Sequence, residues 1–199
     1  MPNWCDTTYK CVGEKKEVES LYNLIQQMEN ADKPIVENGF GKMWLGNLVT
    51  LLGCDWKEYK CRGEIYSYML ENDILTICQC TAWCEQDGVR YAIEEKFPSI
   101  KVYYLDVESG CENYTTNDAS GDYFPCKYCL ECSDEMIEGN REDFENIESL
   151  ANYLSEYLQK EVKSDMDEIE NLIAEHESEM QDKDEDFYLI LHEYKVLED

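Results

Sequence analysis

Three cysteines near the middle of the chain have the spacing of a metal site, because Cys126, Cys129 and Cys132 are each separated by two residues. Such spacing recurs in zinc and iron–sulfur proteins, where it lets thiolates converge on one ion. A bacterial iron–sulfur run continues with a fourth cysteine and a proline, but here Ser133 and Asp134 follow. On a β-strand, Cys126 and Cys132 would face one way and Cys129 the other. We therefore expect no metal and no cofactor. If the chain did bind a metal ion, these three cysteines would be the candidate ligands.

A second group of thiols lies at Cys78, Cys80 and Cys84. The first two alternate as strand residues on a buried face do, which favours a packing role. A cysteine nucleophile needs a neighbouring base. The two histidines, His176 and His192, both lie in the acidic C-terminal third of the chain. We therefore assign no catalytic residue and expect the chain not to be an enzyme.

The tryptophans are the other residues with potential for recognition. Large aromatic side chains anchor many interfaces, but more often they complete a hydrophobic core. We expect at least two of the four to be buried in the core. They stand at positions Trp4, Trp44, Trp56 and Trp83.

The charge of the chain limits its partners, since 45 acidic and 17 basic residues give a net charge of −28. Such a field repels phosphate, so direct binding to nucleic acid or to an anionic membrane is disfavoured. It fits a solvated surface or a protein partner with a basic surface. The 11 cysteines are an odd number, and the N-terminus lacks a basic and apolar export signal. These features predict a cytoplasmic protein with reduced thiols.

Residues 1–132 alternate between strand and helix patterns. The patterns predict strand 4–13, helix 14–31, a short helix 43–52 within an irregular segment 35–62, a hairpin 63–81, helix 85–97, strand 100–107, a turn-rich stretch 108–122 and strand 123–132. This order is that of an α+β ferredoxin-like split βαβ domain with an insertion between its first helix and second strand. In such a domain the amphipathic helices cover one face of an antiparallel sheet.

Residues 133–199 differ in composition, with 23 acidic and 5 basic residues. Apolar residues recur at helical spacing over 142–163 and over 166–180. The segment around 186–197 fits either strand or helix, and we favour strand. We therefore divide the chain into a ferredoxin-like domain, 1–132, and an acidic helical hairpin extension, 133–199, packed on or beside it.

Five short motifs resemble those of a known family: Met1-Pro2-Asn3-Trp4-Cys5, Thr81-Ala82-Trp83, Phe97-Pro98, Thr116-Asn117-Asp118 and Gly121-Asp122-Tyr123-Phe124-Pro125. They are similar to the YubB-type ferredoxin-like domains, small proteins of plasmids, phages and integrated bacterial elements. The resemblance covers about residues 1–131. It implies a ferredoxin-like α+β fold, and it assigns no catalytic or ligand-binding residue.

Three functions follow as hypotheses. The first is a non-enzymatic protein-interaction module of mobile-element origin, with an unknown protein partner. The second is an acidic nucleic-acid mimic that binds a basic DNA-binding protein through residues 133–199. The third is a cysteine-ligated metal protein. The sequence identifies neither the partner nor the oligomeric state.

Overall fold

The computed structural model describes residues 3–133, 140–184 and 186–197. The chain forms two compact units: unit 1 comprises residues 1–119 with 197–199, and unit 2 comprises residues 120–196. The described residues form a mixed α+β structure with five α-helices and two β-sheets. The sequence placed the division between its two parts after residue 132. Among the described residues, no helix combines the length and the apolar composition needed to cross a bilayer.

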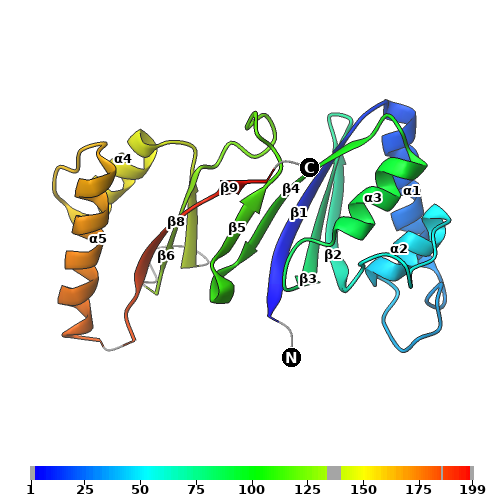
Figure 1. The fold of residues 1–199 in the computed structure, drawn as a ribbon, viewed down its shortest axis with the longest axis horizontal. Coiled ribbons are helices and arrows are strands. Elements are labelled where there is room, and N and C mark those ends of the chain that lie inside the picture. Colours follow the sequence, from blue (N-terminus) through cyan, green and yellow to red (C-terminus); the bar gives the residue numbers. More distant parts are fainter. Residues whose placement is uncertain (1–2, 134–139, 185, 198–199) are drawn as a thin grey trace. The chain divides into compact units, whose positions relative to one another are not determined.

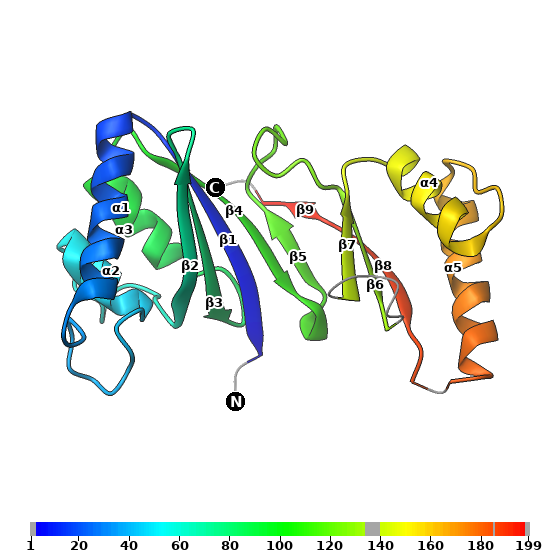
Figure 2. The same cartoon turned by 180° about the vertical axis from the view of Figure 1, so that it is seen from behind.

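Unit 1 contains the first part of the chain (Figure 1). Its elements are β1 (Trp4–Val12), α1 (Lys15–Asn30), α2 (Leu45–Leu52), β2 (Gly63–Glu71), β3 (Ile74–Ala82), α3 (Asp87–Lys96), β4 (Lys101–Glu108), the 3-10 turn η1 (Ser109–Cys111) and β5 (Asn113–Thr116). The strands lie antiparallel in the order β2-β3-β1-β4-β5. Figure 2 shows β2 as the outermost strand, with the three helices on one side of the sheet.

The core of unit 1 lies between its helices and its sheet. Most of the apolar stripe of α1, including Leu21 and Ile25, is fully buried, as the spacing of these residues predicts, and Leu24 is partly buried. On β1, alternate residues such as Tyr9 and Cys11 face the helices and are buried, while their neighbours are partly or fully exposed. The helices therefore cover one face of the sheet.

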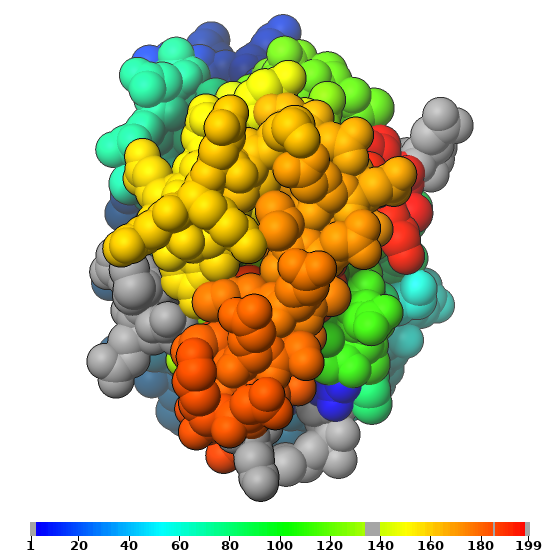
Figure 3. All heavy atoms as spheres, turned by 90° about the vertical axis from the view of Figure 1, so that its left-hand side faces the viewer, coloured from blue at the N-terminus to red at the C-terminus, as the bar shows by residue number. Residues whose placement is uncertain are grey.

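Unit 2 has a sheet and a core of its own. Its elements are β6 (Tyr128–Cys132), β7 (Arg141–Phe144), α4 (Ile147–Leu158), α5 (Met166–Gln181), β8 (Leu189–Glu193) and β9 (Lys195–Val196). The sheet has the order β7-β6-β8, and its core includes Leu130, Leu150, Leu154 and Ile169. Figure 3 shows α4 and α5 side by side on one face of this unit.

The structure corrects the element predictions at three places. The turn-rich stretch 108–122 contains strand β5, and the strand predicted over 123–132 begins only at Tyr128. Residues 133–199 are more than a helical hairpin, because they also supply β7 and β8. The four residues of β7 include three charged ones, so they show no apolar alternation that would reveal a strand. The preference for strand near 187–191 is confirmed by β8.

Candidate functional site

Unit 1 has a large pocket of about 1350 Å³ at one end of its sheet. Four separate segments line it: the start of β1, residues around 40–44, residues 56–64, and the end of β3 with the residues up to Gln86. Five aromatic side chains belong to the lining: Trp4, Phe40, Trp44, Trp56 and Trp83. Because they come from positions far apart in the sequence, only the folded unit brings them together.

Three of these rings are about half exposed to solvent. The exposed fractions are 55% for Trp4, 57% for Phe40 and 49% for Trp83. Trp83 also has a backbone φ of +73°, which a bulky residue rarely adopts. Its N–H donates to the carbonyl of Asn3 at 2.9 Å, which fixes it beside the start of β1. A strained backbone that presents an exposed indole is typical of a functional position.

Three of the rings in the lining pack against one another. Trp44 is only 6% exposed, and Phe40 stacks on it with 5.0 Å between ring centroids. Trp56 meets Trp44 edge to face at 5.1 Å. Gly46 makes room for this arrangement, because a Cβ at that position would lie 2.2 Å from the Trp44 ring. Phe40 is therefore an exposed ring on a fixed support.

The buried side-chain amide of Gln86 connects two of the segments that line the pocket. Its Oε1 accepts the Arg62 N–H at 2.8 Å, and its Nε2 donates to the carbonyls of Cys84 at 2.8 Å and Ala82 at 3.2 Å. The Ala82 N–H in turn donates to the Arg62 carbonyl at 3.0 Å. The segment that bears Trp83 is thereby fixed to the start of β2.

The charged residues around the pocket have both signs. Lys60 is paired with Asp87, with Nζ 2.9 Å from the carboxylate oxygen. The Nζ of Lys57 lies 5.6 Å from the centroid of the Trp56 ring, a cation–π contact. Glu58 and Glu64 also line the pocket. The charged residues in the lining therefore do not form a surface of one sign.

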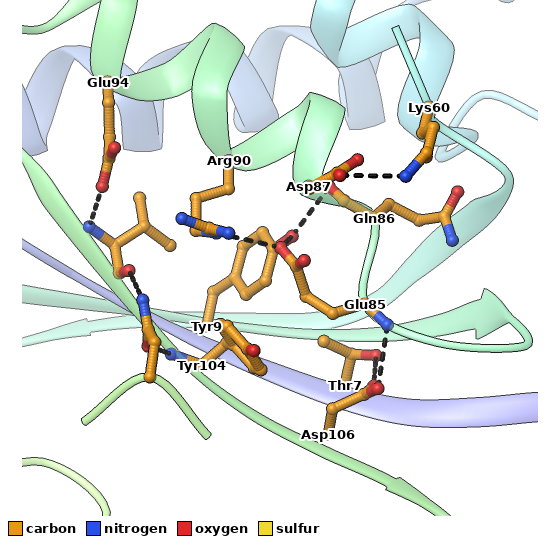
Figure 4. Close-up of polar contacts among 12 residues, drawn as sticks. Thr7, Tyr9, Lys60, Glu85, Gln86, Asp87, Arg90, Glu94, Tyr104 and Asp106 are labelled. Carbon is orange, nitrogen blue, oxygen red and sulfur yellow. Dashed lines mark hydrogen bonds and ion pairs between the residues drawn. The ribbon is translucent and has the colours of Figure 1, made fainter. Parts of the chain in front are cut away.

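A buried polar network anchors the N-terminal end of α3 to the sheet (Figure 4). Glu85 accepts hydrogen bonds from the Tyr9 hydroxyl and, at 3.2 Å, from the Arg90 Nε. Burial raises the pKa of Glu85, and the contacts with Tyr9 and Arg90 offset part of that rise. The Arg90 guanidinium also lies over the Tyr104 ring, at 5.5 Å. Through Glu85, these contacts join Tyr9 of β1 to Arg90 of α3 beside the pocket wall.

A second buried carboxylate continues this network on β4. Asp106 accepts from the Thr7 hydroxyl at 2.5 Å, the Glu85 N–H at 2.8 Å and the Asn113 side-chain amide at 2.6 Å. Burial is the largest cause of the raised pKa of Asp106. The carboxylate therefore joins β1, β4 and the segment before α3.

The thiols in the pocket are protonated at neutral pH. Burial raises the pKa of Cys61 to about 11, and burial followed by Asp106 and Glu85 raises the pKa of Cys84. Burial and Glu64 also raise the pKa of Cys80. Because the thiolate is the nucleophile, this environment does not activate cysteine chemistry.

The predicted metal ligands lie in unit 2 and do not converge. Cys126 precedes β6, while Cys132 packs in the core and Cys129 lies near Asp143 on the other side of the strand. Within the ranges that the structure describes, there is no group of three or more histidine, cysteine or carboxylate side chains that could hold a metal ion. His176 contacts the rings of Tyr157 and Phe187, at 5.6 and 5.9 Å.

The acidic residues of α5 bear on the idea of a nucleic-acid mimic. The buried side of this helix includes Ile169 and Ile173. At 100° per residue, the acids cover the rest of the circumference instead of forming one row. They are Asp167, Glu168, Glu170, Glu175, Glu177 and Glu179. This distribution is typical of a solvated amphipathic helix.

The sequence named the four tryptophans as possible anchors for a partner but predicted no pocket. Trp44 lies in the core and Trp56 packs against it, whereas Trp4 and Trp83 are exposed in the pocket. Phe40 was missed; its position between Gly39 and Gly41 is the only local signal. A comparison of the chain with protein-family models, curated proteins and solved structures gives no match.

Proposed function

We propose that the chain is a non-enzymatic protein-interaction module whose binding surface is the aromatic pocket of unit 1. The observation that carries this proposal is the set of three half-exposed rings, Trp4, Phe40 and Trp83, around one pocket. Aromatic residues are enriched among the side chains that dominate binding energy at protein interfaces. Exposed rings fixed by a rigid support lose little conformational entropy when a partner covers them.

The size of the pocket favours a polypeptide over a small molecule. Its volume of about 1350 Å³ exceeds the roughly 300–1,000 Å³ of typical small-molecule sites. The net charge of −28 opposes binding to phosphate-rich nucleic acid or anionic membranes and favours a partner with a basic surface. The raised pKa values of Cys61, Cys80 and Cys84 also argue against thiol catalysis in the pocket.

We also propose that unit 1 is a ferredoxin-like split βαβ domain of mobile-element origin. The strand order β2-β3-β1-β4 and the placement of helices on one face support this assignment. The short motifs that resemble YubB-type domains support the proposed origin. A cytoplasmic location is consistent with the cysteines, since all eleven lie in described residues and are free thiols.

Selection of peptides tests the proposed function. Random linear peptides of about twelve residues, displayed on phage, are selected on the whole wild-type chain, and their affinities are then measured by fluorescence anisotropy. We expect Trp83→Ala to weaken binding at least tenfold, or about 1.4 kcal/mol. Tyr91→Ala is the matched control, because Tyr91 is also 49% exposed but lies on α3 outside the pocket.

Two results would contradict the proposal. One is that selection recovers no peptide with measurable affinity for the folded chain. The other is that Trp4→Ala, Phe40→Ala and Trp83→Ala all bind the recovered peptides as tightly as the wild type does. Near-ultraviolet circular dichroism of each variant checks that the remaining aromatic cluster is still packed.

A further inference from the structure

The outer strand of the unit 1 sheet, β2, begins at the aromatic pocket and has a partner strand on one side only. On its other side the chain itself pairs with the first residues of the strand. Trp44 forms an isolated antiparallel bridge with Glu64, and the Ile65 N–H donates to the Met43 carbonyl at 2.9 Å. From Tyr66 onward, no described residue continues this pairing.

The turn after β2 determines which backbone groups point outward. Asn72 and Asp73 have φ values of +50° and +64°, as the two central residues of a type I′ turn do. In such a hairpin the flanking pair, Glu71 and Ile74, is hydrogen-bonded, and the bonded and non-bonded pairs then alternate back to Ser67, beyond which a β-bulge shifts the register. The N–H and carbonyl groups of Tyr68 and Leu70 therefore point away from β3, toward the free side.

The side chains of β2 do not protect this edge. Natural edge strands are commonly blocked by lysine or proline, and β2 has neither. Instead, Tyr66 and Met69 are 59% and 51% exposed. The charged residues of the strand are Glu64 and Glu71, both acidic and exposed. This edge thus combines free backbone groups, apolar contact area and negative charge.

We propose that an extended, basic segment of a partner protein adds to this edge as a further strand and places a side chain in the aromatic pocket. This inference rests on the proposed function and specifies its mode of binding. Strand addition supplies backbone hydrogen bonds, while the pocket selects a side chain. Residues 66–71 span about 20 Å, so a segment of six or seven residues covers them.

Charge distinguishes this occupant from a second copy of the chain. Pairing two β2 edges would bring together two strands whose charged residues are all acidic, in chains that each have a net charge of −28. Like charges across a strand pair are destabilising. A partner segment with lysine or arginine at the corresponding positions has the complementary charge.

Backbone methylation of the selected peptides tests this mode. The probes are synthetic versions of the peptides that depend on Trp83, each methylated at one backbone nitrogen at a time. We expect methylation at every second residue to weaken binding at least tenfold, because those N–H groups pair with β2. Methylation at the intervening residues, whose N–H groups face solvent, is the matched control and should change affinity less than threefold.

Two measurements on the whole chain accompany the methylation experiment. Hydrogen exchange at the Tyr68 and Leu70 amides should slow when peptide is bound, while exchange on α3 stays unchanged. Glu71→Lys should weaken binding of the basic peptides at least threefold. Glu112→Lys makes the same charge change after η1, across the sheet from β2, and should have a smaller effect.

The outcomes separate this inference from the proposed function. Peptides that depend on Trp83 but tolerate methylation at every position would overturn strand addition and leave the pocket as the binding surface. Selection of acidic instead of basic peptides would contradict the proposal that the partner segment is basic. Selected peptides whose affinity is unchanged by Trp4→Ala, Phe40→Ala and Trp83→Ala would overturn the proposed function itself.

Discussion

At the scale of single residues, the pocket depends on two small structural details. Gly46 leaves space for the Trp44 ring, and the Gln86 amide joins the backbone around Trp83 to that of Arg62. Neither residue would be noticed for its own chemistry. Both act by fixing aromatic side chains that a partner would contact.

Substitution of Gly46 by alanine should destabilise unit 1. The added Cβ would lie 2.2 Å from the Trp44 ring, so the ring must move. Overpacking of this kind costs about 1–3 kcal/mol, more than the gain of roughly 1 kcal/mol from alanine in a helix. Urea unfolding followed by tryptophan fluorescence measures the change. Gly41→Ala is the control, because nothing lies within 4 Å of a Cβ there and its stability should change little.

The raised pKa of Glu85 predicts that the stability of the folded chain depends on pH with a definite sign. Its pKa in the folded chain is raised above the ordinary value of 4.5, mainly by burial. The folded state therefore binds the proton more tightly than the unfolded state does. The resulting stabilisation is complete below pH 4.5 and is lost as the pH rises through the raised folded-state pKa.

Comparison of the wild type with Glu85→Gln isolates this contribution. Urea midpoints measured between pH 4 and 8 should fall more steeply with rising pH in the wild type than in the variant. The glutamine keeps an oxygen that accepts from Tyr9 and Arg90, so the packing is conserved. Parallel curves for the two proteins would show that Glu85 does not have a raised pKa.

At the scale of secondary-structure elements, the sequence predicts what periodicity can reveal. The apolar stripe of α1 and the alternation along β3 predict those elements to within a residue or two. The strands β5 and β7 were missed, because each has only four residues and these are mostly polar or charged, which gives no pattern of their own. Their pairing with β4 and β6 is tertiary information.

The pocket was less predictable than the elements. Trp4 and Trp83 are 79 positions apart in the sequence, yet the register of β1 and β3 pairs Trp4 with Ala82 and so brings them together. The positive φ of Trp83 has no signal in the sequence, since that region usually favours glycine or asparagine. The exposed rings therefore had to be found in the folded chain.

The N-terminal cap of α4 makes a prediction for unit 2. The Asn146 side chain accepts the Ser149 N–H at 2.9 Å, and Ser149 completes a capping box. Asn146→Ala should reduce stability by about 0.5–2 kcal/mol, because it leaves a helix N–H without its acceptor. Far-ultraviolet circular dichroism during urea unfolding gives the value. Glu145→Ala, at the neighbouring exposed position, should cost less; an equal loss would contradict the capping role.

At the scale of the whole molecule, the charge of the chain opposes its own compaction. The net charge is −28 in 199 residues, and residues 133–199 carry −18 of it. Repulsion among like charges is weaker in the expanded unfolded chain, so it destabilises the folded state. Salt screens this repulsion, since the Debye length falls from about 30 Å at 0.01 M to about 10 Å at 0.1 M.

Added salt should therefore stabilise the folded chain and weaken its binding to a basic peptide. Between 0.01 and 0.3 M NaCl, the urea midpoint should rise, and KCl should act equally because screening does not depend on the cation. The affinity for a basic peptide should fall over the same range, since the attraction is screened as well. These opposite responses follow from one charge distribution. A midpoint that falls with salt would mean that attractive ion pairs, such as Lys60–Asp87, outweigh the repulsion.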